Sequence, residues 1–373
     1  MKRAFAVFAV AMLLCGCSSR PNNNGVANPN SVAPNPSGAF LRGAWVTTIW
    51  NIDYPKAPTT DSTKLKTEID QIVARAKGLG LNALFFQVRP CADAFYNSDI
   101  FPWSKWLTET QGLAPSNAFD PLEYIIGRAH THNIQLHAWI NPYRVTALAT
   151  EKLVATHPAR LAPELTINVD GKLYWNPGEP HARDLVINGV REIVENYAVD
   201  GIHFDDYFYP EGITTHDFGT WLNFGDGDNI ADWRRSNVDQ LVHDTHKAIK
   251  EIAPGVVFGV SPSGIWANKS HNGLGSDTQG FESYYEIFAD SRGWVKKGFV
   301  DYIAPQIYWR TGQLGSDFQI ILDWWRDVVE STTVKLYTGI GAYRYFGANE
   351  YETQKQLATE IGDGFIMFSF GDL

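Results

Sequence analysis

The sequence predicts an α/β fold, a TIM (β/α)8 barrel with loop insertions. Eight apolar runs rich in β-branched and aromatic residues recur along the chain, and helical patterns lie between them. This alternation is typical of parallel barrels, and 373 residues suit a barrel with insertions. The alternative is a doubly wound sheet, which would more often carry a glycine-rich phosphate turn after the first strand. This chain has Thr47-Thr48-Ile49-Trp50 there.

The expected elements alternate in the order that a barrel requires. The expected strands are Gly43–Thr48, Ala83–Arg89, Gln135–Asn141, Gly201–Tyr207, Val256–Ser261, Tyr302–Tyr308, Lys335–Ala342 and Gly364–Phe370. The expected helices are Lys64–Lys77, Pro121–His132, Ala182–Tyr197, Ala231–Ile252, Phe281–Lys296, Ser316–Val329 and Glu350–Ile361. Asp120 is a good N-cap before Pro121, which suits a first helical position. The chain stops at Leu373, so the eighth helix is expected to be missing, because either the barrel closes without it or the sequence is truncated.

Composition narrows the class of protein. Hydrophobic residues make up 44% and charged residues 19%, which predicts a sizeable core rather than disorder. The net charge of -10 argues against a partner with a phosphate backbone, so no nucleic acid is expected. The 13 tryptophans indicate a large core or a cleft that stacks flat ligands.

The N-terminal segment predicts export and a lipid anchor. Lys2 and Arg3 precede an apolar run that is too short to span a membrane, as in a signal peptide. The run ends in Leu14-Cys15-Gly16-Cys17, which resembles a bacterial lipobox and implies lipidation of Cys17. The alternative is an ordinary secretory signal. Ser18 is not the aspartate that often signals inner-membrane retention, which favours the outer membrane, facing the periplasm, in a Gram-negative organism.

The chain therefore divides into three expected parts. Residues 1–16 are the predicted signal peptide, 17–39 a flexible Asn- and Pro-rich tether, and 40–373 the barrel domain. Only Cys91 would remain as a free thiol, so no intramolecular disulfide is expected.

The active site of a TIM barrel lies at the carboxyl ends of its strands. Aromatic, amide and carboxylate side chains collect at these ends without a phosphate cradle, which suits a carbohydrate. The predicted substrate-binding residues are Arg89, Asp93, His137, Trp139, Asn141, Tyr143, Arg144, His203, Tyr207, Trp266, Gln306, Tyr308 and Trp309. Thr47, Trp50, Gln87, Ser261 and Tyr343 also follow strand ends, but they are not assigned to the site.

Roles within this set follow from side-chain chemistry. Trp139, Trp266 and Trp309 are expected to be sugar platforms, meaning flat faces on which sugar rings stack. Arg89, Asn141, Arg144 and Gln306 are expected to orient substrate, because arginine stays protonated and amides do not titrate.

The fourth strand carries the sharpest signal. Alternation places His203 and Asp205 on one face of this strand, which would point into the barrel. Asp206 points inward only if the strand breaks there. Two carboxylates this close raise the pKa of one of them, which suits acid–base chemistry. The alternative is that Asp206 caps a loop or pairs with an arginine.

Seven motifs in this order resemble the glycosyl hydrolase-like 10 family. They are Arg42–Val46, Phe86–Pro90, His137–Arg144, Asp200–Tyr209, Gly259–Trp266, Gly275–Thr278 and Asp301–Trp309. The resemblance covers about residues 40–373 and implies a TIM-barrel glycosidase of the bacterial envelope. It further implies peptidoglycan glycan strands, stripped of stem peptides, as the substrate.

Glycosidases usually need a second carboxylate. Asp206, Asp277 and Asp93 are the candidates, and Asp277 lies on a glycine-rich loop that could swing over a substrate. Asp205 is expected to act as nucleophile or base, with Asp206 or Asp277 as the acid. The spacing of the pair, which separates retention from inversion, stays open, as does the oligomeric state.

No cofactor and no metal are expected. His130 and His132 lie near His137 in the sequence, but they fall on different faces of a helix end. Polysaccharide deacetylation would need a His/Asp metal set that the sequence does not show. The remaining alternative is a catalytically inactive lipoprotein that binds glycans.

Overall fold

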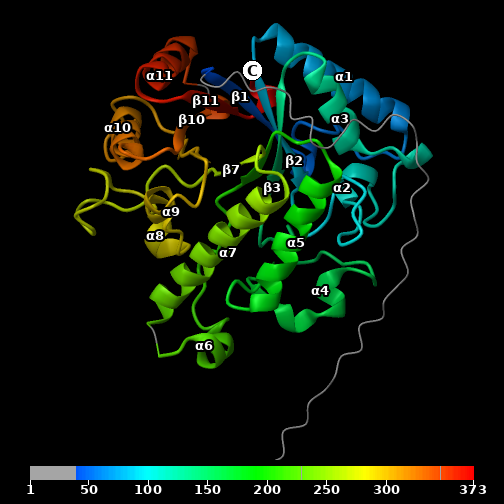
Figure 1. Ribbon diagram of the computed structural model, residues 1–373, viewed down its shortest axis with the longest axis horizontal. Coiled ribbons are helices and arrows are strands. Elements are labelled where there is room, and N and C mark those ends of the chain that lie inside the picture. The colour runs from blue at the N-terminus through cyan, green and yellow to red at the C-terminus, as the bar shows by residue number, and fades with distance from the viewer. Residues whose placement is uncertain (1–38, 228, 345) are drawn as a thin grey trace, which may run out of the picture.

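The computed structural model describes residues 39–227, 229–344 and 346–373. The predicted signal peptide, Cys17 and all but the last residue of the predicted tether lie outside these residues. Figure 1 shows the strands gathered at the centre of the molecule with helices packed around them. No helix in the described part of the chain is long and apolar enough to cross a membrane.

The strands form a closed parallel barrel, as predicted. Neighbouring strands run in the order β1, β2, β3, β6, β7, β8 and β10, and β11 pairs with both β10 and β1. The barrel strands are β1 (Leu41–Val46), β2 (Ala83–Arg89), β3 (Gln135–Ile140), β6 (Gly201–Phe204), β7 (Val257–Val260), β8 (Tyr302–Ile303), β9 (Gln306–Ile307), β10 (Lys335–Gly341) and β11 (Gly364–Phe368).

Two expected strands differ most from the prediction. β6 ends at Phe204 instead of Tyr207, because the register with β3 stops at the pair Ile140 and Phe204. The sixth barrel strand is broken into β8 and β9, with Pro305 in the break. Proline has no N–H to donate to a neighbouring strand, which explains the interruption.

Helices connect the barrel strands. They are α1 (Ser62–Gly78), α3 (Pro121–His130), α5 (Pro180–Asn196), α7 (Ile230–Ile252), α8 (Ser283–Glu286), α9 (Ser291–Lys297), α10 (Phe318–Val329) and α11 (Ala348–Ile361). The expected helix at 281–296 is two helices, because Phe288 adopts a φ of 56° that no α-helix accommodates. Asp120 caps α3 as predicted, and its side chain accepts from the backbone N–H groups of Leu122 and Glu123.

Insertions at the carboxyl ends of the strands were not predicted as elements. They are α2 (Lys105–Thr108), α4 (Pro158–Leu161), the antiparallel pair β4 (Thr166–Val169) and β5 (Lys172–Trp175), and α6 (Phe218–Phe224). These segments follow β2, β3 and β6, so they rise on the side of the barrel where a site is expected. Figure 1 shows α4 and α6 far from the strands.

The turn after β11 is hydrogen bonded to the loop after β1. β11 is followed by a 3-10 turn at Phe370–Asp372, and no α-helix follows it up to Leu373. The buried carboxylate of Asp53 accepts from the N–H of Thr47 at 2.8 Å and from the N–H of Gly371 at 2.7 Å. This clamp joins the loop after β1 to the turn after β11.

Candidate active site

A cavity of about 380 Å³ opens at the carboxyl ends of the strands. Six predicted site residues line it: Trp139, Arg144, Asp205, Tyr207, Gln306 and Tyr308. Nine other residues complete the wall: Trp45, Thr47, Ile49, Trp50, Ile52, Gln87, Ser261, Tyr343 and Phe368. Most of these nine follow strand ends, which is the signal that could have identified them from the sequence.

Asp205 is a buried carboxylate held by four donors. Its Oδ2 accepts from the indole Nε1 of Trp139 at 3.2 Å and from the amide Nδ2 of Asn141 at 3.1 Å. Its Oδ1 accepts from the backbone N–H of Asp206 at 2.9 Å and from the amide Nε2 of Gln306 at 3.2 Å. Donors of this kind favour the ionised form of a carboxyl group.

A relay of amides fixes the orientation of Asn141. The Oε1 of Gln87 accepts from the backbone N–H groups of Thr48 and Ile49, so its Nε2 must point the other way. That Nε2 donates to the Oδ1 of Asn141 at 2.9 Å. The Nδ2 of Asn141 is therefore left to face Asp205, and Gln87 acts as a positioning residue that the sequence analysis missed.

Asp206 lies beside Asp205 but lines a second cavity, of about 390 Å³. Burial raises the pKa of Asp206 well above its ordinary value, and the negative charge of Asp205 raises it further. Both effects favour the protonated form of Asp206, whose backbone N–H donates to the Oδ1 of Asp205 at 2.9 Å. Tyr207 lines both cavities and separates them.

Arg144 and Tyr207 form one wall of the first cavity. The Nε of Arg144 donates to the backbone carbonyl of Pro90 at 2.9 Å, and its guanidinium lies 4.6 Å from the centre of the Tyr207 ring. The charge of Asp205 and burial both raise the pKa of the Tyr207 hydroxyl, so this group stays protonated. The wall therefore offers a fixed cation and a neutral phenol to a ligand.

His203 and His137 form a buried layer of the barrel interior and do not line the cavity. The indole Nε1 of Trp45 can only donate, so the Nε2 of His203, 3.0 Å away, must accept. The Nδ1 of His203 then donates to the hydroxyl of Tyr302 at 3.0 Å, and this hydroxyl donates to the Nδ1 of His137 at 3.1 Å. Burial lowers the pKa of both rings, that of His137 to about 4, so both stay neutral.

Two of the three expected sugar platforms, Trp266 and Trp309, do not line the cavity. Trp266 is buried, and its ring stacks on that of Trp324 with 5.9 Å between the ring centres. Its indole Nε1 donates to the Oδ1 of Asp290 at 3.0 Å, outside the cavity. Trp309 is half-buried and packs against the hydrophobic core. Trp50 lines the cavity instead and is 49% exposed. The centre of its ring lies 4.7 Å from the centre of the Trp106 ring.

Arg89, Asp93 and Tyr143 are fully buried and do not line the cavity. The register between β2 and β3 shifts between Gln87 and Arg89, so alternation no longer turns Arg89 inward. Its guanidinium lies 3.9 Å from the ring centre of Phe101, against α5. The expectation that Arg89 contacts a substrate in this cavity is therefore corrected. Burial raises the pKa of Asp93 to about 6.

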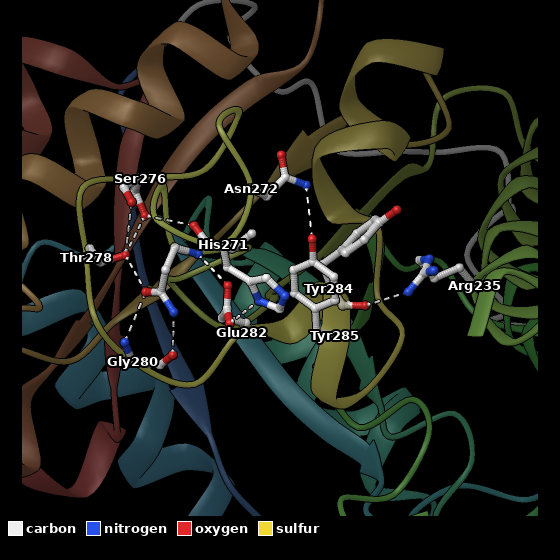
Figure 2. Close-up of polar contacts among 11 residues, drawn as sticks. Arg235, His271, Asn272, Ser276, Thr278, Gly280, Glu282, Tyr284 and Tyr285 are labelled. Carbon is white, nitrogen blue, oxygen red and sulfur yellow. Dashed lines mark hydrogen bonds and ion pairs between the residues drawn. The ribbon is translucent and has the colours of Figure 1, made fainter.

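Asp277 is exposed and does not line either cavity. Figure 2 shows the loop that carries it, held by contacts among Thr278, Gly280, Glu282 and their neighbours. The Oδ1 of Asn268 accepts from the Thr278 hydroxyl at 3.0 Å and from the Gly280 N–H at 3.0 Å. On the other side of Asp277, the backbone N–H of Ser276 donates to the carbonyl of Ala267 at 3.0 Å. The loop is thus tied down on both sides of Asp277, and the structure does not bring this carboxylate together with Asp205.

No cluster of three or more His, Cys, Asp or Glu side chains suited to a metal ion occurs among the residues that the structure describes. The two carboxyl groups of the candidate site are Asp205, held by neutral donors, and Asp206, whose pKa is raised. Such a pair can stabilise positive charge and protonate a departing oxygen.

Comparisons with known proteins agree with this chemistry. The sequence profile of the glycosyl hydrolase-like 10 family matches residues 40–356. Glycosyl hydrolase YngK of Bacillus subtilis is 38% identical over 351 residues, which cover 89% of this chain and 68% of the relative. Glycosyl hydrolase DigH of Escherichia coli is 37% identical over 368 residues, which cover 92% of this chain and 83% of the relative.

Solved structures support the fold. The glycoside hydrolase domain of PgaB (BpsB) from Bordetella bronchiseptica has a TM-score of 0.56 at 11% identity, covering 88% of this chain and 94% of that one. The catalytic domain of β-amylase from Paenibacillus polymyxa has a TM-score of 0.57 at 11% identity, covering 90% and 94%. The chain therefore belongs to the glycosyl hydrolase-like 10 family and is a glycoside hydrolase.

Proposed function

We propose that this enzyme hydrolyses the glycan strands of peptidoglycan in the bacterial cell envelope. The observation that carries the proposal is the position of Asp205, ionised at the base of a cavity whose walls are aromatic rings and amides. Rings and amides of this kind stack on sugars and hydrogen bond to their hydroxyls. The substrate is the one that the family resemblance implies.

Two carboxyl groups divide the chemistry. Four hydrogen-bond donors hold Asp205 in place, and its carboxylate stabilises the positive charge that develops on the sugar ring. Asp206 keeps its proton because burial and the charge of Asp205 raise its pKa, and it protonates the departing glycosidic oxygen.

The two cavities give room for a polymer. Trp50, Tyr308 and Tyr343 present aromatic faces in the first cavity, and Tyr174 and Phe281 do so in the second. Tyr207 borders both, so a glycan chain that crosses this ring contacts both cavities. Asp205 lines the first cavity and Asp206 the second, so both carboxyl groups meet such a chain near Tyr207.

A lipid on Cys17 would hold the enzyme at a membrane, and we propose the outer membrane, facing the periplasm. The lipobox-like sequence and the tether at 17–39 support this location. A coil of about 20 residues reaches ~25 Å, and ~60 Å when extended, which brings the barrel to a nearby polymer.

Digestion of peptidoglycan, intact and peptide-stripped, tests the function. Wild type, Asp205→Asn and the control Asp184→Asn, an exposed carboxylate on α5, are compared by mass spectrometry of the products. We expect wild type and Asp184→Asn to release reducing ends from stripped strands, and Asp205→Asn to release several hundred-fold less, on the order of 10²–10³. Equal products from all three proteins would remove Asp205 from the mechanism. No product from any would leave a protein that only binds glycans.

A further inference from the structure

Asp205 and Asp206 are arranged unlike a common glycosidase pair, whose carboxyl groups flank the bond that is cut. Retaining enzymes hold their two carboxyl groups about 5–5.5 Å apart, and inverting enzymes about 6.5–9.5 Å apart. Here the backbone N–H of Asp206 donates to the Oδ1 of Asp205 at 2.9 Å, so the two residues lie side by side. They also follow one another at the end of β6, so they reach a substrate from the same side of the barrel.

A nucleophile must stand on the face of the sugar opposite the departing oxygen. Among the described residues that line the first cavity, Asp205 is the one carboxylate. The second cavity adds Asp170 and Glu211, which are exposed and belong to the turn between β4 and β5 and to the loop after β6. Within the described part of the chain, therefore, no carboxylate of the first cavity faces Asp205 from across the substrate.

The hydrogen bonds of Asp205 also argue against attack by its own oxygens. A carboxylate has about four lone-pair sites, and four donors contact this one. An oxygen that attacks a sugar carbon must give up one of these bonds. The arrangement instead suits an anion that stays in place and stabilises a neighbouring cation.

We propose that the nucleophile is supplied by the substrate, as the carbonyl oxygen of the acetamido group on the sugar carbon next to the reacting one. The inference rests on the proposed function, because both sugars of a peptidoglycan strand carry this group. The walls of the first cavity fit its methyl group, since Trp45, Trp139 and Tyr308 form an aromatic surface around Asp205.

In the first step the acetamido oxygen forms a bond to the anomeric carbon as the bond to the glycosidic oxygen breaks. The departing oxygen takes the proton of Asp206 and leaves as an alcohol. The ring that forms is an oxazolinium ion, and its positive charge lies against the carboxylate of Asp205.

In the second step one water molecule attacks the anomeric carbon and gives its proton to Asp206. The bond from the acetamido oxygen to that carbon breaks, which restores the acetamide and the proton on Asp206. The two steps together consume one water molecule for each glycosidic bond that is cut. Two inversions at the anomeric carbon give net retention of configuration.

The test varies the acetamido group and leaves the enzyme unchanged. Wild type is given peptide-stripped strands, the same strands after de-N-acetylation, after re-acetylation, and after N-trifluoroacetylation, which weakens the carbonyl oxygen as a nucleophile. We expect kcat/KM to fall at least about 100-fold on de-N-acetylated strands, because an intramolecular nucleophile is lost. Re-acetylation should restore the rate, and trifluoroacetylated strands should be intermediate.

Two further measurements complete the design. Proton NMR of the first products should show a retained anomeric configuration, and a thiazoline analogue of the oxazolinium ion should inhibit wild type competitively. Equal cleavage of acetylated and de-N-acetylated strands, an inverted product, or a glycosyl adduct on Asp205, Asp170 or Glu211 would each overturn this mechanism and leave the hydrolase activity standing. If no form of the strand is cut, the proposed substrate fails, and the mechanism fails with it.

Discussion

The indole Nε1 of Trp139 donates a hydrogen bond to the Oδ2 of Asp205 across 3.2 Å, so one side chain both walls the cavity and holds its carboxylate. This contact links β3 to the end of β6, two neighbouring strands of the barrel. It gives the tryptophan a polar function in addition to the stacking function that its position at a strand end predicts.

Replacing Trp139 with Phe separates these two functions. The variant keeps an aromatic face and loses the donor, so we expect kcat to fall by about 10-fold, equivalent to ~1.4 kcal/mol, with KM changed less than two-fold. Steady-state kinetics on stripped glycan strands measure both constants. Trp266→Phe, which loses a donor to Asp290 outside the cavity, serves as the control and should keep both constants. A change in KM alone for Trp139→Phe would contradict the polar function.

Asp206 and Asp277 compete as the proton donor, and matched amide variants decide between them. Asp206→Asn should reduce kcat by about 10²–10⁴-fold, because a positioned general acid is lost. Asp277→Asn should remain within about two-fold of wild type, since its side chain is exposed and lies outside both cavities. If Asp277→Asn were instead the less active variant, the general acid would be Asp277, in the loop after β7.

The activity should depend on pH through the carboxyl pair. Asp206 must be protonated to act, and its pKa is raised by burial and by the charge of Asp205, so kcat should fall as pH rises through this raised pKa. In Asp206→Asn the residual activity should lose this high-pH limb. A high-pH limb that persists in this variant would point to another acid.

Stability should depend on pH through Asp93. Burial raises the pKa of this carboxyl group from 3.8 to about 6, so its ionised form is disfavoured in the folded protein. The free energy of unfolding should therefore decline as pH rises from about 4 to about 6, by up to ~3 kcal/mol from this group. Denaturant titrations at a series of pH values measure the decline. Asp93→Asn should flatten it, and an unchanged slope would exclude Asp93 as its source.

Trp50 should behave as a sugar platform, and Trp266 and Trp309 should not. Trp50→Ala removes a face that is 49% exposed in the cavity, and we expect KM to rise by a factor that corresponds to ~1–3 kcal/mol of stacking. Trp266→Ala and Trp309→Ala should lower Tm with KM unchanged, because both rings pack away from the cavity. Thermal melts and glycan titrations on the three variants distinguish these outcomes.

Lipidation is tested by Cys17→Ala. The change removes the sulfur that the lipobox-like sequence would modify, so we expect the protein to move from the membrane fraction to the soluble fraction of the envelope. Immunoblots of the fractions measure this, with Cys91→Ala as the matched control, since Cys91 is a buried free thiol of the barrel. Membrane retention of Cys17→Ala would show that the segment is an anchor of another kind or is not modified.

The regular part of the barrel could be predicted because its signal is local. Ala83–Arg89 is a mainly apolar and aromatic run, interrupted by Gln87 and ended by Arg89, and β2 has these bounds in the structure. The β4–β5 hairpin was missed although Asp170 and Gly171, both with positive φ, form its two-residue turn. Its strands are only four residues long, too short for a clear alternation.

Within the site, the sequence alone determined that Asp205 faces the barrel interior, because alternation along one strand fixes the face of each residue. Only the tertiary structure decided which side chains surround the Asp205 carboxylate in the cavity. A register shift turned Arg89 outward, and the paths of the loops carried Trp266, Trp309 and Asp277 away from the cavity. The donors to Asp205 come from separate segments, and contacts between distant segments depend on how the strands pack, which residue spacing does not encode.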